Sequence, residues 1–413
     1  MKKNRLLAWL CVILMIATAF MGCTPAPAAT SEPAPTENAP APAQPEQPAA
    51  PSEPTEDTTP VTLNFATAGD TNMMEFFQNM IVPEFNKVYP HISVNVAGTG
   101  AGDSGSKTIH TKLRAQLDAG KETWDLDAAC VNQSVMRDLI ADGLIVKFVG
   151  DLENEKYVNT VSAQNALGTP VEGYVVPLFQ SQVVIAYNPA MVANPPKTFA
   201  ELETWIKENP NKFGYNGVTG GMSGVGFTIG YVYYKTGMYD TFAKGVYDPA
   251  NEAAWPDVIK GLKSLPVVYT QGNAGTLDML NRGEIAMGPV WVDMFYLWKS
   301  DGRMDPNMKM ILPEPGLPGQ PMYLVVSTKG ENQDAAKKFI DFIARPEIQA
   351  KYVVEASTWY PGIDASAVFE VCSDEAKAKL FSEVTSEELA AKGLSLMLTT
   401  YQADLLRTYE EVR

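Results

Sequence analysis

The clearest candidate for chemistry is a glycine-rich segment, residues 98–108, between a predicted strand and a predicted helix. A Walker-type phosphate loop places a lysine directly after its last glycine, so that the lysine reaches the phosphates of a nucleotide. Here Ser106 separates Gly105 from Lys107, and the pattern fails by one residue. Free N–H groups at the start of the helix can still hold an anionic or hydroxylated ligand. The alternative is a flexible loop on the rim of a site.

A second glycine-rich segment, residues 220–226, does not form a nucleophile elbow. That motif reads G-x-S-x-G, and Val225 occupies the position of its final glycine. We therefore predict that these glycines let the backbone approach a ligand or a neighbouring strand closely.

Histidine and cysteine are scarce. A histidine-based zinc site or a Ser-His-Asp triad would have to use His91 or His110, and neither lies in a motif such as H-E-x-x-H. Outside the N-terminal segment only Cys130 and Cys372 remain. They could form a disulfide in an exported protein or stay separate as small apolar side chains. The sequence predicts no catalytic residues, no metal site and no cofactor.

The elements that position these segments alternate between strand and helix. The predicted strands cover residues 61–67, 92–96, 125–130, 183–187, 284–288 and 322–327. The predicted helices cover residues 72–88, 109–120, 131–141, 199–209 and 334–344. Thr198 is the predicted cap of the fourth helix, with Glu201 in capping-box position. This alternation indicates an α/β fold with mainly parallel sheets covered by helices.

The N-terminus has the pattern of an export signal. Three positive charges precede an apolar run, residues 6–21, that is short for a membrane-spanning helix. The run ends at Gly22 and Cys23, which resembles the bacterial lipoprotein cleavage box. We expect residues 1–22 to be a lipoprotein signal peptide and Cys23 to carry the lipid, palmitate included. The alternative is an ordinary signal peptide with a chance cysteine.

Residues 23–60 are expected to be a disordered tether. Positions 24–60 contain eleven prolines, nine alanines and six acidic residues, with no lysine, arginine, aromatic or branched aliphatic side chain. Such a segment buries too little apolar area to offset the entropy of ordering, and its prolines keep it extended. Similar leashes occur on surface lipoproteins of Gram-positive cells, so we expect a lipid-anchored, extracytoplasmic protein.

The rest of the chain is long enough for two domains, since 353 residues follow position 60. The full chain has a net charge of −16, and removal of Lys2, Lys3 and Arg5 with the signal brings it to −19. This argues against a nucleic-acid partner, because phosphate binding draws on clustered lysine and arginine.

Segments in a fixed order resemble the extracellular solute-binding proteins of ABC importers. They are VPEFNKVYP at 82–90, WDLD at 124–127, LIADGL at 139–144, YVVPL at 174–178 with IAYNP at 185–189, PPKTFAEL at 195–202, RGEIAMGPVW at 282–291, and AKKFIDF at 336–342 with RPE at 345–347. The resemblance covers most of residues 61–365.

This resemblance implies a two-lobed fold of the type II periplasmic-binding-protein class. Each lobe would be a mainly parallel sheet flanked by helices, and crossover hinge strands near 175–179, 287–289 and 321–324 would join the lobes. The first lobe is expected to hold 61–178 plus 288–320, and the second 179–287 plus 321–413. A solute would bind between the lobes, since open α/β sheets bind ligands at the carboxyl ends of their strands.

The resemblance also places candidate ligand-binding residues in that cleft: Asp70, Thr71, Asn132, Phe179, Gln180, Gln182, Trp291, Asp293, Trp359 and Tyr360. Aromatic faces with amide, hydroxyl and carboxylate partners suit sugars and polyols. Because the set contains carboxylates and no lysine or arginine, we expect a neutral polyhydroxyl or a cationic, polyamine-like solute rather than a dianion.

The implied function is capture of a small polar solute for an ABC permease by a non-enzymatic, monomeric lipoprotein. One alternative is a lipoprotein that senses its ligand for a membrane receptor, which would use the same lobe closure. A less favoured alternative is a lipid-anchored hydrolase, which would need a nucleophile–base pair or paired carboxylates that the motifs do not provide.

Overall fold

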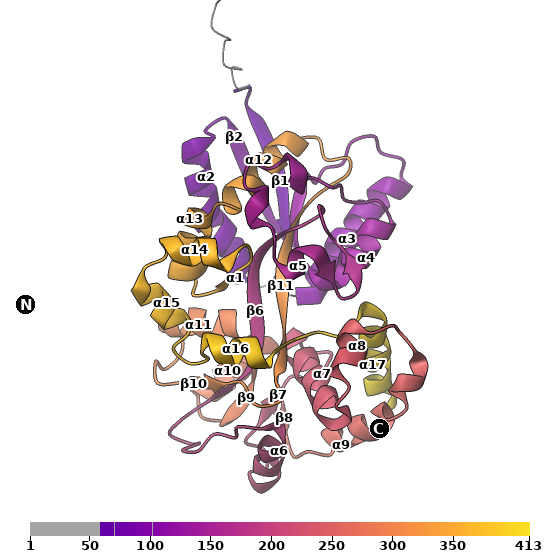
Figure 1. Ribbon diagram of the computed structural model, residues 1–413, viewed down its shortest axis with the longest axis vertical. Helices are drawn as coiled ribbons and strands as arrows, with labels where there is room; N and C mark the ends of the chain where they lie inside the picture. The colour runs from indigo at the N-terminus through magenta and orange to yellow at the C-terminus, as the bar shows by residue number, and fades with distance from the viewer. Residues whose placement is uncertain (1–57, 70, 101) are drawn as a thin grey trace, which may run out of the picture. The chain divides into compact units, whose positions relative to one another are not determined.

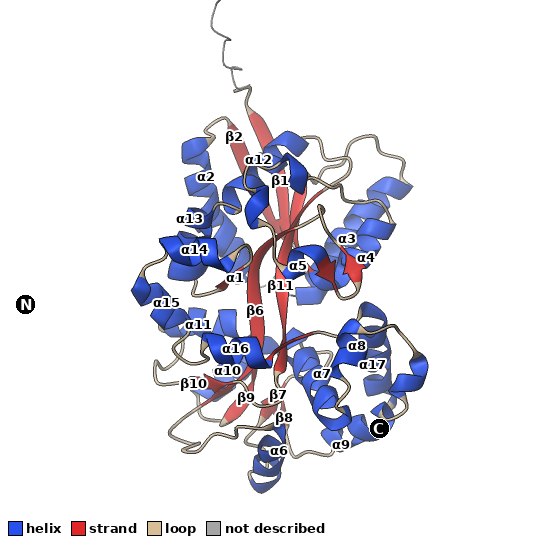
Figure 2. Cartoon of the chain, viewed as in Figure 1, coloured by secondary structure: helices blue, strands red, loops and turns tan. Residues whose placement is uncertain are grey.

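The computed structural model describes residues 58–69, 71–100 and 102–413. The predicted signal, Cys23, nearly all of the predicted tether and Asp70 lie outside the described residues. The described chain folds into two α/β halves, one above the other in Figure 1, which confirms the expected two-lobed class. Figure 2 shows strands running through the middle of both halves with helices on their flanks.

Two long antiparallel strands connect the halves: β6 (Val176–Tyr187) and β11 (Leu317–Val326). They run vertically through the centre of Figure 1. Their pairing joins Phe179 to Met322 and Ser181 to Gln320, so both strands pass through the level where the halves meet. Because every residue of β6 except Gln180 is buried, the connection is a packed part of the core rather than a loose linker.

The upper half is built on three parallel strands, β1 (Val61–Thr67), β2 (Ile92–Gly98) and β3 (Ala128–Asn132). The upper part of β11 extends this sheet antiparallel to β3. The flanking helices are α1 (Thr71–Glu75), a π-helix η1 (Phe76–Ile81), α2 (Val82–Val88), α3 (Gly102–Asp118), α4 (Met136–Ala141) and α12 (Gln333–Ile343). In Figure 1, α2 lies on one side of the sheet and α3 and α4 on the other.

In the lower half, β9 (Met287–Trp291) and β10 (Lys309–Ile311) pair with the second part of β6. A short parallel pair, β7 (Gly214–Tyr215) and β8 (Val268–Tyr269), lies beside them. The helices are α6 (Phe199–Glu208), α7 (Met222–Thr236), α8 (Tyr239–Lys244), α9 (Trp255–Lys263), α10 (Gly272–Asn281), α11 (Val292–Ser300) and α17 (Thr399–Glu411). The predicted cap of α6 is present, because the Thr198 side chain accepts a bond from the N–H of Glu201.

The remaining elements complete both halves. The helices are α5 (Val161–Gln164), α13 (Pro346–Ile348), a π-helix η6 (Gln349–Ala356), α14 (Ala365–Val371), α15 (Asp374–Leu380) and α16 (Ser386–Lys392). The short strands are β4 (Asn165–Ala166), β5 (Thr169–Pro170), β12 (Tyr360–Pro361) and β13 (Gly393–Ser395). Four short 3₁₀ segments are η2 (Gln133–Val135), η3 (Val149–Asp151), η4 (Glu155–Tyr157) and η5 (Pro249–Glu252).

The strand pairing differs from the expected lobe division. That division put 288–320 in the first lobe, yet β9 and β10 pair with the lower part of β6. It put 321–413 in the second lobe, yet upper β11 pairs with β3 and α12 contacts β1. The sequence pattern locates strands but does not say which neighbour they pair with. We propose that the first lobe holds 61–180 and 321–371, and the second 181–320 and 393–413.

Both glycine-rich segments run into helices. Helix α3 begins at Gly102, so the loop predicted after the strand ends earlier than expected, and α7 begins at Met222 within residues 220–226. The predicted helix over 131–141 is wrong at its start, because β3 continues to Asn132 and α4 begins only at Met136. Asn132 therefore stands at the carboxyl end of a strand.

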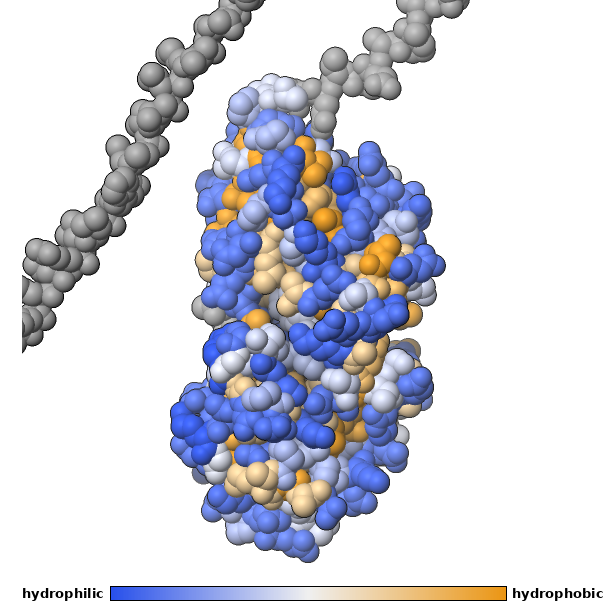
Figure 3. Space-filling model, turned by 90° about the vertical axis from the view of Figure 1, so that its left-hand side faces the viewer, coloured by the Kyte–Doolittle hydropathy of each residue, from blue (hydrophilic) through white to orange (hydrophobic). Residues whose placement is uncertain are grey.

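Cys130 and Cys372 are buried and unpaired, so the alternative of two separate thiols is correct. Burial raises the pKa of the Cys130 thiol far above its ordinary value, which keeps it protonated. Hydrophilic residues dominate the face shown in Figure 3, as expected for a chain with this net charge. Among the described residues, no helix combines the length and apolar character needed to cross a bilayer.

Candidate functional site

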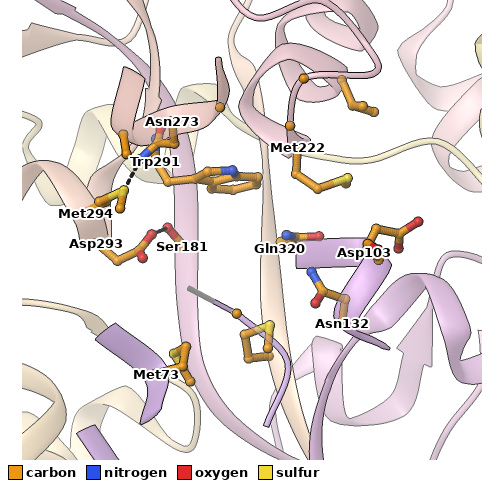
Figure 4. A pocket seen from close by; sticks show the side chains of 18 of the residues that line it. Met73, Asp103, Asn132, Ser181, Met222, Asn273, Trp291, Asp293, Met294 and Gln320 are labelled. Carbon is orange, nitrogen blue, oxygen red and sulfur yellow. Dashed lines mark hydrogen bonds between the residues drawn. The ribbon is translucent and has the colours of Figure 1, made fainter. Parts of the chain in front are cut away.

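A cleft of about 650 Å³ opens between the two halves, and residues from both halves line it. The upper half supplies the start of α1, the first turn of α3 and the end of β3. The lower half supplies the starts of α7, α10 and α11 and part of α17. The connecting strands β6 and β11 cross the back of the cleft, as Figure 4 shows. This is the position expected for ligand binding in open α/β sheets.

The upper wall is organised around Asn132. The Ser106 hydroxyl donates to Asn132 Oδ1 at 2.9 Å and accepts from the Asn132 N–H at 2.9 Å. Both residues are buried, and the bonds fix the amide at the end of β3 with its N–H₂ group left for a ligand. Nearby, Asp103 Oδ2 lies 2.9 Å from Lys107 Nζ, and its other oxygen accepts a bond from Ser134.

Alternation along the connecting strands selects which side chains face the cleft. Phe179 and Ser181 line it from β6, and Gln320 and Met322 line it from β11. Each pair is two residues apart, because successive side chains of a strand point to opposite faces. Gln320 is only 7% exposed, and its Oε1 has no hydrogen-bond partner within the described chain. An unpaired buried carbonyl oxygen is costly, so this atom is suited to accept a bond from a solute.

Trp291 dominates the lower wall. Its ring stands in the open centre of Figure 4, with Met222 of the same wall to its side. The backbone N–H of Trp291 donates to Asn273 Oδ1 at 2.8 Å, which ties the end of β9 to the first turn of α10. The indole offers a flat apolar face that suits the C–H face of a sugar ring or an alkyl chain, and it can also stack against a cation.

Asp293 follows Trp291 in the first turn of α11 and accepts a hydrogen bond from the Ser181 hydroxyl. Behind it lies Trp359, whose Nε1 donates to the Asp293 backbone oxygen at 3.3 Å. The Trp359 ring is 4.5 Å from Phe179 and 5.0 Å from Phe76, measured between centroids. Trp359 is 2% exposed, so it supports two cleft residues without facing the cleft.

Of the predicted site residues, Asn132, Phe179, Trp291 and Asp293 line the cleft. Asp70 is outside the described residues, and nothing is described of the Thr71 side chain, although Thr71 begins α1 next to the cleft-lining Asn72.

The other predicted residues serve the framework. The Gln180 amide donates to Ser162 Oγ at 2.7 Å, and the Gln182 amide donates to the Leu317 oxygen at 2.5 Å. Tyr360 pairs with Gln180 in the sheet and is buried. Gln180 and Gln182 lie on the face of β6 opposite to Phe179, because successive side chains of a strand point to opposite faces.

Sequence reasoning missed several cleft residues: Ser181, Met222, Asn273, Gln320 and Gln402. Ser181 and Gln320 could have been predicted from strand alternation, because each lies two residues from a residue that faces the cleft, Phe179 or Met322. Met222 and Asn273 needed the knowledge that α7 and α10 begin there. Gln402 lies on α17, far along the chain, and no local signal marks it.

The cleft has the chemistry of a binding site. Within the described part of the chain its charged residues are Asp103, Lys107 and Asp293, and the polar groups are otherwise amides, hydroxyls and backbone N–H groups. No group of three or more histidine, cysteine, aspartate or glutamate residues is placed to hold a metal ion among the residues described.

Comparison with known families gives one clear match. The family model described as bacterial extracellular solute-binding protein matches residues 68–350, more than half of the chain. The search of curated proteins found no match.

Solved structures share the fold at low sequence identity. The spermidine/putrescine ABC transporter substrate-binding protein PotD from Streptococcus pneumoniae has a TM-score of 0.62 at 17% identity, over 84% of this chain and 98% of that chain. Iron-bound HitA from Pseudomonas aeruginosa has a TM-score of 0.60 at 17% identity, over 85% and 99%. The Tp0655 (TpPotD) lipoprotein of Treponema pallidum has a TM-score of 0.62 at 13% identity, over 86% and 99%. This chain therefore has the type II periplasmic-binding-protein fold.

Proposed function

Since the chain belongs to the bacterial extracellular solute-binding proteins, we propose that it is the substrate-binding lipoprotein of an ABC importer. It captures a small polar solute, of carbohydrate, polyol or polyamine-like character, and delivers it to a membrane permease. The observation that carries this proposal is the cleft of about 650 Å³ whose two walls come from different lobes. A solute that contacts both walls favours the closed state, which is the state a permease can recognise.

The arrangement of β6 and β11 supports a hinge. The two strands join the lobes at the back of the cleft, so a small change in their backbone angles would rotate one lobe toward the other. The pairing of these strands shifts register between Met322 and Tyr323, at the level of the cleft. Such irregularities are common where a strand must bend.

The lining supports a solute with hydrogen-bonding groups and an apolar face. Trp291 and Phe179 provide flat surfaces, while Asp293, Asn132 and Gln320 provide acceptors and donors. Two of the structural neighbours are described as spermidine/putrescine transport proteins, which fits a cationic solute. Carboxylates in the cleft favour the same class.

The anchor at Cys23 and the tether 23–60 complete the proposal. A protein that must pass its solute to a permease benefits from staying beside the membrane, and a lipid on Cys23 with a proline-rich leash would keep it there. We propose a monomer on the cell surface, with no catalytic activity.

Isothermal titration calorimetry of the mature chain against sugars, polyols, polyamines, phosphate and sulfate tests the solute class. The proposal expects binding of a polyol or an amine that is weakened at least tenfold by Trp291→Ala. Tight binding of phosphate or sulfate alone would contradict it. Uptake of the labelled solute by cells, lost on deletion of the gene and restored by its return, separates transport from sensing.

A further inference from the structure

Helices α7 and α10 begin side by side at the cleft. Gly221, the residue before α7, packs against the start of α10: a Cβ added to it would lie 3.4 Å from the Gly272 Cα and 3.9 Å from the Asn273 nitrogen. Gly221 has φ +155° and Gly272 has φ +66°, conformations that side chains disfavour. Glycine at both positions therefore allows the two helix starts to meet on the lower wall.

Among the described residues, the first N–H groups of both helices have no acceptor. Neither α7 nor α10 has a capping side chain or an acidic residue in its first turn. The other two long helices that start at the cleft, α3 and α11, carry Asp103 and Asp293 in theirs. Within the described chain, no acceptor is found for the N–H groups of Met222, Ser223, Gly272, Asn273 and Ala274. The N-terminal ends of two helix dipoles add positive potential at this point, which favours an anionic group.

The rest of the cleft requires hydrogen-bond donors instead. Gln320 and Gln402 are 7% and 6% exposed, both line the cleft, and the Oε1 of each has no partner in the described chain. Figure 4 shows the Gln320 amide aimed into the space between Met222 and Asn132. Asp293 and Asp103 add carboxylates on either side of this space. A donor-rich, cationic group fits there.

We propose that the solute carries a carboxylate and an ammonium group together, as an amino acid does. The carboxylate lies on the N–H groups of α7 and α10, and the ammonium group faces Asp293 and the Gln320 oxygen. A simple polyamine would leave the two helix starts without an acceptor, and a simple anion would face two aspartates. The inference rests on the proposed function, namely that this cleft captures a solute. It replaces the carbohydrate, polyol or polyamine-like class named there by a solute that carries both charged groups.

Matched ligands test the inference on the unaltered mature chain. Calorimetry is run with the twenty common L-amino acids and with the amines formed by their decarboxylation, so that each pair differs by one carboxylate; L-ornithine and putrescine extend the series. At least one amino acid should bind tenfold or more tightly than its amine. Binding of polyols or amines with no preference for the carboxylate would overturn the inference and leave the proposed function standing. If no member of any of these classes binds, both are overturned.

A variant pair then locates the carboxylate. Proline at position 222 removes one N–H at the first residue of α7, where proline is compatible with the helix, and Gly221 before it is extended with ψ 164°. Met222→Ala loses the same side chain and keeps the N–H. The amino acid should bind on the order of tenfold more weakly to Met222→Pro than to Met222→Ala. The matched amine should bind both equally, and an equal effect on both ligands would overturn the placement.

Discussion

Trp359 is a supporting residue, and its removal should cost stability before it affects recognition. The side chain is 2% exposed, its ring packs on Phe179 and Phe76, and its Nε1 bonds the Asp293 oxygen. Replacing a buried tryptophan by alanine removes that packing and leaves a cavity, at a cost of about 3–5 kcal/mol. The lost hydrogen bond adds about 1 kcal/mol. We expect Trp359→Ala to lower the free energy of unfolding by about 4–6 kcal/mol.

Urea unfolding of the mature chain, followed by circular dichroism, measures this change. Trp205→Ala is the matched control, because Trp205 is half-buried on α6 and lies outside the cleft. Its truncation should cost about 1–2 kcal/mol, in proportion to the smaller apolar area that it buries. If the free energy of unfolding of Trp359→Ala lies within about 1 kcal/mol of that of the unaltered chain, Trp359 is not a buried support of the site.

Three further predictions concern strand parity, pH and the anchor. Phe179→Ala should weaken solute binding on the order of tenfold, because an aromatic face is lost from the cleft. Gln180→Ala should leave the affinity measured by calorimetry nearly unchanged. Equal losses of affinity would refute the assignment of Phe179 to the cleft face of β6 and of Gln180 to the opposite face. Burial and the Asp404 carboxylate raise the pKa of Glu252 from 4.5 to about 7. Between pH 4.5 and pH 7 the unfolded state therefore binds fewer protons at this residue than the folded state. The free energy of unfolding should fall as the pH rises through this range. The melting temperature should therefore drop from pH 5.5 to 7.5 and vary less in Glu252→Gln; an identical profile would contradict this. Cys23→Ala should release a still-binding protein into the medium, and a variant that remains with membranes after signal cleavage would place the anchor elsewhere.

The strands and helices were predictable where periodicity is strong. The alternation in residues 61–67 and the cap at Thr198 both correspond to the structure. One boundary failed where glycine misleads, since the glycines of 98–108 predicted a loop but lie partly in α3. For residues 220–226 the glycines predicted a close approach of the backbone. Glycine there serves close packing: a Cβ at Gly224 would lie 1.8 Å from the Gly217 oxygen. A local pattern cannot show that a distant backbone will occupy the space.

The site residues were predictable from the sequence where they end a single strand, but not where their position depends on how distant parts of the chain pack together. Asn132 and Trp291 stand at the ends of strands, and both line the cleft. The sequence does not show that Gln182 faces away from Phe179, because a buried strand has no alternation of polarity and its two faces look alike. Gln402 reaches the cleft only because α17 returns to the lower lobe at the end of the chain. Such long-range contacts have no local signature.

A small polar solute should bind between Trp291 and Asn132 and draw the lobes together. A crystal structure of the mature chain, soaked in a lysate of its native cells or grown with the tightest ligand from calorimetry, would show whether it does. We expect the solute to contact residues of both walls, with the two lobes closer than in the ligand-free protein. A solute bound outside this cleft, or bound with no contact to one of the lobes, would contradict it.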